Sequence, residues 1–186
     1  MATLFQGEKV RLRAVEAADW EVHYHWNMDS DNGRMTDEVW FPTSREFVQE
    51  WAESESKRRD EEDAFRFQIE SLAGELVGTI NTNNCNLRCG TFNYGLAIHP
   101  DHRRKGYASE AIGLVLRYYF GERRYQKVNA EVYSFNDASI ALHERLGFAL
   151  EGRLRRMIYS DGVFHDKLIY GLTKEEFEAA GWKPKP

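Results

Sequence analysis

The middle of the chain alternates apolar and polar side chains over short stretches. In residues 65–70 every second side chain is apolar, which is the period of a half-buried strand. A turn at 72–75 and apolar stretches at 76–82 and 91–100 follow. They predict a meander of antiparallel strands, and the alternation at 10–16 predicts a first strand ahead of it.

Other segments show the spacing of helices. Residues 107–120 carry apolar or aromatic side chains at positions 108, 111, 112, 115, 116 and 119. These offsets form one stripe, so we predict a helix that packs this stripe on a core. Residues 18–30 and 44–57 predict two more helices, the second capped by Thr43 or Ser44.

The last third of the chain predicts a strand, a helix and a hairpin. Residues 127–135 predict a strand that is parallel to the preceding one if the helix between them is a crossover. Residues 136–148 predict a short helix that an Asn-Asp pair can cap. Asp161-Gly162 lies between two apolar runs and is a strong signal for a two-residue hairpin. The expected fold class is α+β (α/β), with a mixed, mostly antiparallel central sheet, one parallel crossover and flanking helices.

Composition narrows the class of protein. The 186 residues contain 42% hydrophobic and 30% charged side chains, an ordinary balance for one core. No repeat or linker divides them, so we expect a single domain over residues 1–186. No apolar run approaches the roughly 20 residues of a membrane span, and the first residues show no signal-peptide pattern. We therefore expect a cytoplasmic protein with no membrane partner, either a monomer or a homodimer.

Charge and cysteine content argue against a nucleic-acid partner and against a metal site. The net charge of −5 and the pI of about 5.7 oppose a nucleic-acid partner. The acid-rich segment 53–63 is interpreted as a solvated helix end and loop. Cys85 and Cys89 have no second Cys/His pair at zinc spacing, so we interpret them as reduced thiols and expect no metal.

One basic segment stands out against this acidic chain. Arg103, Arg104 and Lys105 precede Gly106 at the turn into the helix predicted at 107–120. The first turn of a helix has unpartnered N–H groups and a positive dipole end, which together suit a phosphate. The order Lys-Gly-Tyr does not fit a P-loop, and a single glycine does not make a dinucleotide fingerprint.

Two motifs carry a family resemblance. The segment from Arg103 to Ala108 fits Arg/Gln-x-x-Gly-x-Gly/Ala and resembles the acetyl-coenzyme A signature of the GNAT superfamily of N-acetyltransferases. Residues 136–148 are similar to a second motif of that family, Asn-x-x-Ser-x-x-x-x-Glu-Arg-x-Gly-Phe. Residues 144–166 resemble the branch that includes ribosomal-protein N-terminal acetyltransferases. The resemblance extends to the element order over most of the chain, and implies direct transfer of an acetyl group from acetyl-coenzyme A to a primary amine.

The resemblance also implies where the donor lies. Amides from about Arg104 to Ser109 would hold the pyrophosphate of coenzyme A. The strand ending at Ile98 would pair with the pantetheine arm, where the two parallel strands splay apart. Asn136 would contact the arm with Ser139 near it. Taken alone Asn136 would be interpreted as a helix cap and nothing more, but with both motifs present we favour the contact with the arm. The donor-binding candidates are therefore Ile98, Arg103, Arg104, Lys105, Gly106, Tyr107, Ala108, Ser109, Asn136 and Ser139.

The chemistry needs no nucleophile from the protein, but it needs proton transfers and stabilisation of an oxyanion. Backbone N–H groups around Leu96 to Ile98 can stabilise the oxyanion. Many family members place a tyrosine seven residues after the motif asparagine to protonate the leaving thiolate, and here that position is His143. His143 is the catalytic candidate if its surroundings raise its pKa above about 6.5, and otherwise it is packing. The spacing singles out no general base among Glu131, Tyr94 and Asn81.

The acceptor is less constrained than the donor. The family builds the acceptor side from the first helices and the last hairpin, and the first helices supply Trp20, Tyr24, Trp26, Trp40 and Phe41 with the acids Asp29, Asp31 and Glu38. We expect a cationic amine, either a protein or peptide N-terminus or, as the alternative, a small amine or polyamine. A non-catalytic module that binds acetyl-coenzyme A and an anion or nucleic-acid binding module remain competing hypotheses.

Overall fold

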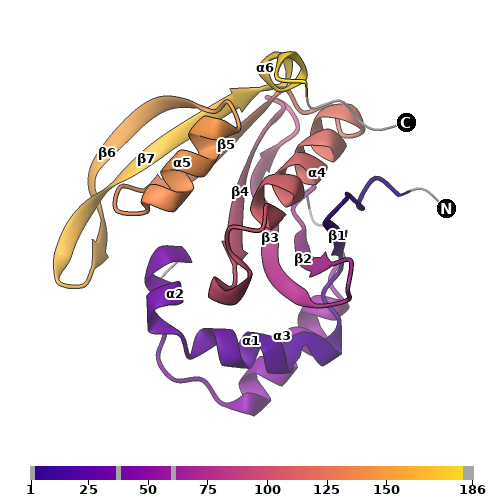
Figure 1. Cartoon of the computed structure of the whole chain (residues 1–186), viewed down its shortest axis with the longest axis vertical. Coiled ribbons are helices and arrows are strands. Elements are labelled where there is room, and N and C mark those ends of the chain that lie inside the picture. The colour runs from indigo at the N-terminus through magenta and orange to yellow at the C-terminus, as the bar shows by residue number, and fades with distance from the viewer. Residues whose placement is uncertain (1–2, 37–38, 60–61, 182–186) are drawn as a thin grey trace.

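The computed structural model describes residues 3–36, 39–59 and 62–181. It contains a seven-stranded sheet in the order β1-β2-β3-β4-β5-β7-β6, in which every neighbouring pair is antiparallel except β4 and β5 (Figure 1). The strands are β1 (Val10–Arg13), β2 (Arg66–Ser71), β3 (Leu76–Asn86), β4 (Thr91–Ile98), β5 (Lys127–Tyr133), β6 (Ala149–Ser160) and β7 (Val163–Thr173). This confirms the mixed, mostly antiparallel sheet with one parallel crossover.

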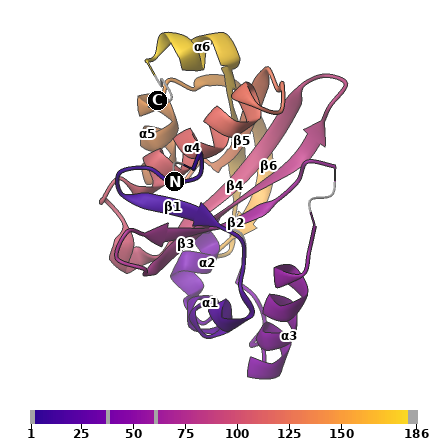
Figure 2. The same cartoon turned by 90° about the vertical axis from the view of Figure 1, so that its right-hand side faces the viewer.

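Two helices cover one face of the sheet and three gather at one end of the molecule. The helices are α1 (Trp20–Asn27), α2 (Ser30–Thr36), α3 (Arg45–Ser56), α4 (Tyr107–Gly121), α5 (Asp137–Arg145) and α6 (Lys174–Ala179). In Figure 1, α4 and α5 lie in front of the central strands, while α1, α2 and α3 lie below them. The view turned by 90° shows the same grouping of α1 to α3 (Figure 2).

The structure departs from the predicted helices at two places. The helix predicted at 18–30 is found as α1 but ends at Asn27, and α2, which was not predicted, begins at Ser30. The Asp29 carboxylate accepts the backbone N–H of Asn32 at 2.9 Å and caps α2. The helix α6 was not predicted. It begins with a capping box, in which Thr173 and Glu176 accept each other's backbone N–H groups. The hairpin prediction is confirmed: Asp161 and Gly162 join β6 to β7 with φ values of 50° and 78°.

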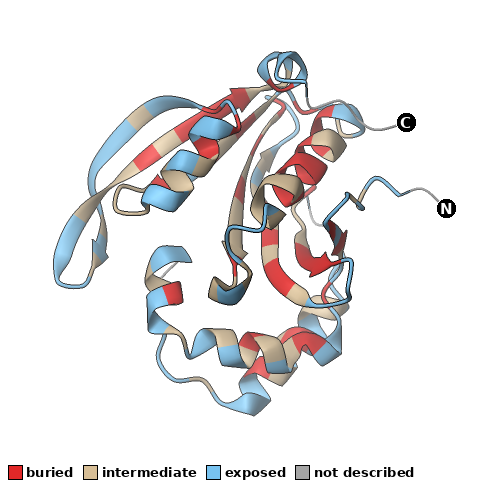
Figure 3. Cartoon of the chain, in the orientation of Figure 1, coloured by how far each residue is buried: buried red, intermediate tan, exposed pale blue. Residues whose placement is uncertain are grey.

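The core lies between α4 and the sheet, and Figure 3 shows the middle of α4 buried. The predicted stripe on α4 is confirmed, since Ala111, Ile112 and Val115 are at most 1% exposed. Tyr119 on the same stripe stacks on Phe92 of β4, with ring centroids 4.4 Å apart. This packing fixes α4 against β4 and therefore fixes the turn that connects them.

The parallel pair β4–β5 opens along its length. The two strands pair from Thr91 with Lys127 as far as Tyr94 with Ala130. Beyond that point β4 continues to Ile98 along β3, and β5 continues along β7. The edges of β4 and β5 that face each other are therefore unpaired past Tyr94, and they form the splay in which we expected the donor arm.

Candidate active site

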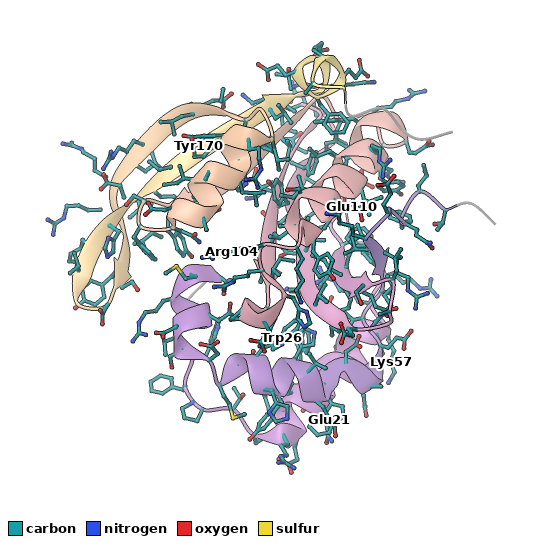
Figure 4. The ribbon with its side chains drawn as sticks, viewed as in Figure 1. Glu21, Trp26, Lys57, Arg104, Glu110 and Tyr170 are labelled. Atoms are coloured by element: carbon teal, nitrogen blue, oxygen red, sulfur yellow. The ribbon has the colours of Figure 1, made fainter. Side chains whose placement is uncertain are left out.

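The basic segment forms the turn from β4 into α4, and we call residues 103–109 the anion turn. Gly106 is the N-cap of α4 with φ +85°, and Arg104 also has a left-handed φ of +62°. Within the described part of the chain, the backbone N–H groups of residues 104–109 have no hydrogen-bond acceptor, and the first helical bond comes from Glu110 to the Gly106 carbonyl. Figure 4 shows Arg104 at this end of α4. The geometry suits a pyrophosphate, because N–H groups and the helix dipole point toward the same place.

The start of β1 holds this turn in place. The Glu110 carboxylate accepts the backbone N–H groups of Glu8, Lys9 and Val10 at 2.7–2.8 Å, and Figure 4 shows Glu110 on the side of α4 nearest β1. The Lys9 ammonium donates to the Lys105 carbonyl at 3.2 Å. Lys9 is thus a further cation beside the anion turn, and it could not be predicted from the motif because 96 residues separate it from Lys105.

Arg103 has partners of its own. Its Nε donates to the Ile98 carbonyl at 3.1 Å, and its Nη2 donates to Asn32 Oδ1 of α2 at 2.7 Å. Among the described residues, Arg104 and Lys105 form no ion pair. Arg103 therefore connects the anion turn to α2, while Arg104 and Lys105 keep their charges available to an anion.

The unpaired edge of β4 presents N–H groups to the splay. The N–H of His99 bonds to the Val77 carbonyl on β3. Because N–H directions alternate along a strand, the N–H groups of Ile98 and Leu96 point away from β3 and into the splay. These are the groups that the sequence suggested for the pantetheine arm and the oxyanion.

Asn136 and Ser139 lie at the start of α5, across the splay from the anion turn. Asn136 Oδ1 accepts the N–H of Ser139 at 3.1 Å, so Asn136 is the helix cap that the sequence allowed. Its Nδ2 donates to the Met35 carbonyl of α2 at 3.0 Å. Asn136 thus has a contact across the cleft in addition to its capping bond.

His143 is buried on the inner side of α5 and is 5% exposed. Its Nδ1 lies 2.7 Å from the Ser139 carbonyl, which can only accept, so Nδ1 carries the proton. Its Nε2 lies 2.7 Å from the Tyr94 hydroxyl and accepts from it. Burial lowers the pKa of His143, because a buried site disfavours imidazolium. The raised pKa that a direct acid role required is therefore not found.

A cleft of about 990 Å³ opens beside these groups. Trp26, Trp40 and Phe41 line it as expected, and Phe41 is 92% exposed. Trp20 and Tyr24 do not line the cleft. A smaller cavity of about 320 Å³, between β1, β2 and α4, contains neither motif. The larger cleft is therefore the candidate active site.

Neutral polar side chains form much of the sheet wall of this cleft, which Arg66 of β2 also lines. The neutral side chains are those of Thr79, Asn81, Asn83, Asn84 and Asn93. Glu131 also lines the cleft, but its carboxylate pairs with Lys167 Nζ at 2.5 Å. Asp29 lines the cleft as well, whereas Asp31 pairs with Arg34 outside it, and Glu38 lies outside the described residues.

Comparisons with known proteins agree with this geometry. Residues 9–149 match the family model described as the acetyltransferase (GNAT) domain. The chain belongs to the GNAT family. It is 42% identical over 95% of its length, and 96% of the relative, to an uncharacterised prophage-derived N-acetyltransferase (YokL) of Bacillus subtilis. It is 31% identical over 56% of its length, and 57% of the relative, to a putative ribosomal N-acetyltransferase (YdaF) of the same organism.

A spermidine acetyltransferase is similar in both sequence and structure. The spermidine N(1)-acetyltransferase of Vibrio cholerae is 27% identical over 90% of this chain and 95% of its own length. The crystal structure of a spermidine N-acetyltransferase from that organism, in complex with CoA and spermine, superposes with a TM-score of 0.79 at 21% identity. It covers 92% of this chain and 99% of that one. At this identity the structural likeness shows the GNAT fold.

As a GNAT enzyme, the chain transfers an acetyl group from acetyl-coenzyme A to an amine. The residues present fit this co-substrate, because the anion turn and the splayed edge of β4 both present N–H groups. Within the described ranges, no group of three or more His, Cys, Asp or Glu side chains could hold a metal ion. The helices of the described residues are all too short or too polar to cross a membrane.

Proposed function

We propose that the acetyl group goes to the α-amine of a peptide or protein N-terminus. The observation that supports this acceptor is the row of amide side chains on the sheet wall of the cleft. Asn81 and Asn83 on β3 and Asn93 on β4 offer amide donors and acceptors, and the nearby Glu131 already has a cationic partner in Lys167. A peptide N-terminus carries one cation followed by amide groups, and side-chain amides satisfy such groups well.

A site that binds a polyamine needs a different set of side chains. It carries several cations separated by apolar carbons, so a site for it needs several carboxylates without partners of their own. Asp29 is a cleft carboxylate that has no cationic partner among the described residues, although it accepts the N–H of Asn32. The similarity to a spermidine acetyltransferase and the aromatic faces of Trp26 and Trp51 keep a polyamine as the second candidate, since aromatic faces attract cations.

The test is a panel of acceptors assayed by release of free coenzyme A. It contains peptides with a free N-terminus, the same peptides with a blocked N-terminus, spermidine, and simple primary amines. We expect the free peptides to give the highest kcat/KM and the blocked peptides to give none. A kcat/KM for spermidine at least tenfold above that of every peptide would overturn the proposed acceptor.

Two variants link the result to the cleft. Asn81→Ala should lower kcat/KM for peptides about tenfold, because a peptide amide loses its partner. Asp29→Asn should leave peptide turnover within a few-fold and should weaken only a polycation. If Asp29→Asn abolishes turnover of every acceptor while Asn81→Ala has no effect, the acceptor is recognised by charge and not by its amides.

A further inference from the structure

Acetyl transfer to an amine requires one proton to move from nitrogen to sulfur. The amine nitrogen forms a bond to the thioester carbon and becomes positively charged, and the C–S bond then breaks to release a thiolate. The nitrogen must lose a proton and the sulfur must gain one. Both atoms are attached to the same carbon in between, so one hydroxyl beside that carbon can reach both.

Tyr94 is the hydroxyl group at this place. It lies in the last residue pair before β4 and β5 separate, and it lines the cleft although it is only 7% exposed. Its proton points to His143 Nε2, because the other nitrogen of that ring donates to the Ser139 carbonyl. Among the described residues nothing donates to the Tyr94 oxygen, so its lone pairs can accept a proton from a group bound beside it.

His143 is held so that it receives this proton. Its ring stacks between those of Tyr94 and Tyr170, with centroids 5.9 and 5.7 Å away, and Phe148 packs against its edge. On the far side of Tyr170, the Glu144 carboxylate accepts the Tyr170 hydroxyl at 3.3 Å. This packing fixes the imidazole ring with Nε2 against the Tyr94 oxygen.

We infer that Tyr94 and His143 form a two-member relay that carries the proton from the attacking amine to the leaving sulfur. The amine nitrogen gives a proton to the Tyr94 oxygen while the Tyr94 proton passes to His143 Nε2. The resulting imidazolium then returns its proton to the Tyr94 oxygen, and Tyr94 gives a proton to the thiolate. The pair ends as it began, and the products are an amide and a thiol.

The relay accounts for two features of the cleft. Burial lowers the pKa of His143, which makes its imidazolium a stronger proton donor toward a thiolate. Glu131, the carboxylate considered as a base, already has a cationic partner in Lys167. Tyr94 is thus the catalytic residue in this inference, and His143 acts through it.

The inference rests on acetyl transfer to an amine but not on the peptide acceptor, so the kinetics use any amine that the panel identifies. Tyr94→Phe should lower kcat by about 10²-fold or more, with the Kd for acetyl-coenzyme A and the KM for the amine within a few-fold. The matched control is Tyr170→Phe, which removes a hydroxyl on the other side of the same imidazole and should keep kcat within a few-fold. If Tyr94→Phe turns over at the rate of this control, the inference is wrong.

The double variant Tyr94→Phe/His143→Tyr provides a rescue. It moves the phenol from β4 to α5, and a tyrosine at 143 extends its hydroxyl into the space that the Tyr94 hydroxyl leaves. We expect kcat to recover at least tenfold over Tyr94→Phe. The variant Tyr94→Phe/His143→Phe should be no slower than Tyr94→Phe alone, because members of one relay are not additive. A multiplicative loss in this double variant would mean that the two residues act separately.

A spectroscopic test needs no acceptor. In ¹⁵N NMR of the protein at neutral pH, the His143 ring should show a proton on Nδ1 and none on Nε2. A proton on Nε2 would leave Tyr94 without its acceptor and would overturn the relay even if no amine in the panel were turned over.

Discussion

Asn136, the N-cap of α5, donates its side-chain amide to the Met35 carbonyl of α2 at 3.0 Å. A residue of the donor motif thus holds a helix of the acceptor side. Arg103 makes the equivalent contact from the anion turn, through Asn32 of the same helix. Because α2 is bound from both sides of the splay, its position depends on the groups that we expect to contact coenzyme A.

Two substitutions of Asn136 separate its roles. Asn136→Asp keeps an oxygen that caps α5 through the Ser139 N–H, whereas Asn136→Ala loses it. We expect the free energy of unfolding to fall by about 1 kcal/mol in the alanine variant only, as for other lost N-caps. Both variants lose the donation to Met35, so both should raise the acceptor KM several-fold. Urea unfolding and steady-state kinetics measure the two effects, and an aspartate variant with the parent KM would show that the Met35 contact is unimportant.

Gly106 tests the anion turn. Its φ of +85° disfavours other residues, and a Cβ there would lie 2.7 Å from the Lys9 ammonium. Gly106→Asp should reduce affinity for acetyl-coenzyme A by at least 100-fold, because it adds bulk and negative charge where we expect the pyrophosphate to bind. Gly74→Asp is the control: Gly74 has φ +88° with no atom near its Cβ, and it lies in the β2–β3 turn. Calorimetric titration of both variants checks this, and equal affinities would contradict the placement of the pyrophosphate.

Glu110 tests how β1 supports that turn. Its carboxylate accepts three backbone N–H groups from residues 8–10. Glu110→Gln replaces one accepting oxygen by a donor, so we expect a loss of about 1–3 kcal/mol in the free energy of unfolding. Glu122→Gln changes an exposed carboxylate at the other end of α4, where a negative charge is unfavourable, and should not destabilise. Equal stabilities of the two variants would mean that water replaces the Glu110 contacts at little cost.

The features that the sequence predicted are local. The stripe on α4, the Asn136 cap and the hairpin turn each depend on residues within a few positions of one another, so spacing reveals them. The parallel crossover was also predicted, because a helix of the right length separates two strands. The helix predicted at 18–30 ends earlier, at Asn27, and α2 was not predicted because Asp29 was interpreted as a helix residue and not as a cap.

The contacts that were not predicted from the sequence join segments that are distant along the chain. Lys9 reaches the anion turn from 96 residues away, and Tyr94 is 49 residues from His143. Asp63 lies in the acidic run interpreted as solvated, yet it is buried, where it pairs with Arg123 and accepts the Tyr125 hydroxyl at 3.0 Å. Such contacts follow from the pairing of strands and helices in space, and a one-dimensional pattern does not contain them.

The buried ring of His23 should make the stability of the protein depend on pH. His23 on α1 is 8% exposed, and it accepts from Gln68 while Trp26 and Trp51 pack against its ring. Burial lowers its pKa from 6.5 to about 4, and Asp19 opposes this shift only in part. The folded protein therefore holds His23 neutral at a pH where the unfolded chain is already protonated.

The sign of the pH effect follows from this difference. Between pH 6.5 and 4 the unfolded chain binds a proton that the folded chain does not, so stability falls as the pH falls. The slope from this one group approaches about 1.4 kcal/mol per pH unit, and the loss of stability levels off below the pKa of His23 in the folded protein.

The variant His23→Gln keeps a polar partner for Gln68 but does not titrate. The free energy of unfolding of the parent minus that of this variant, measured in urea from pH 7 to pH 4, should therefore decrease by about 3 kcal/mol. The exposed His25→Gln is the control, because water solvates that ring in both states. If the difference in the free energy of unfolding between the parent and His23→Gln stays constant over this range, then His23 takes up a proton equally well in the folded and the unfolded protein, and the prediction is wrong.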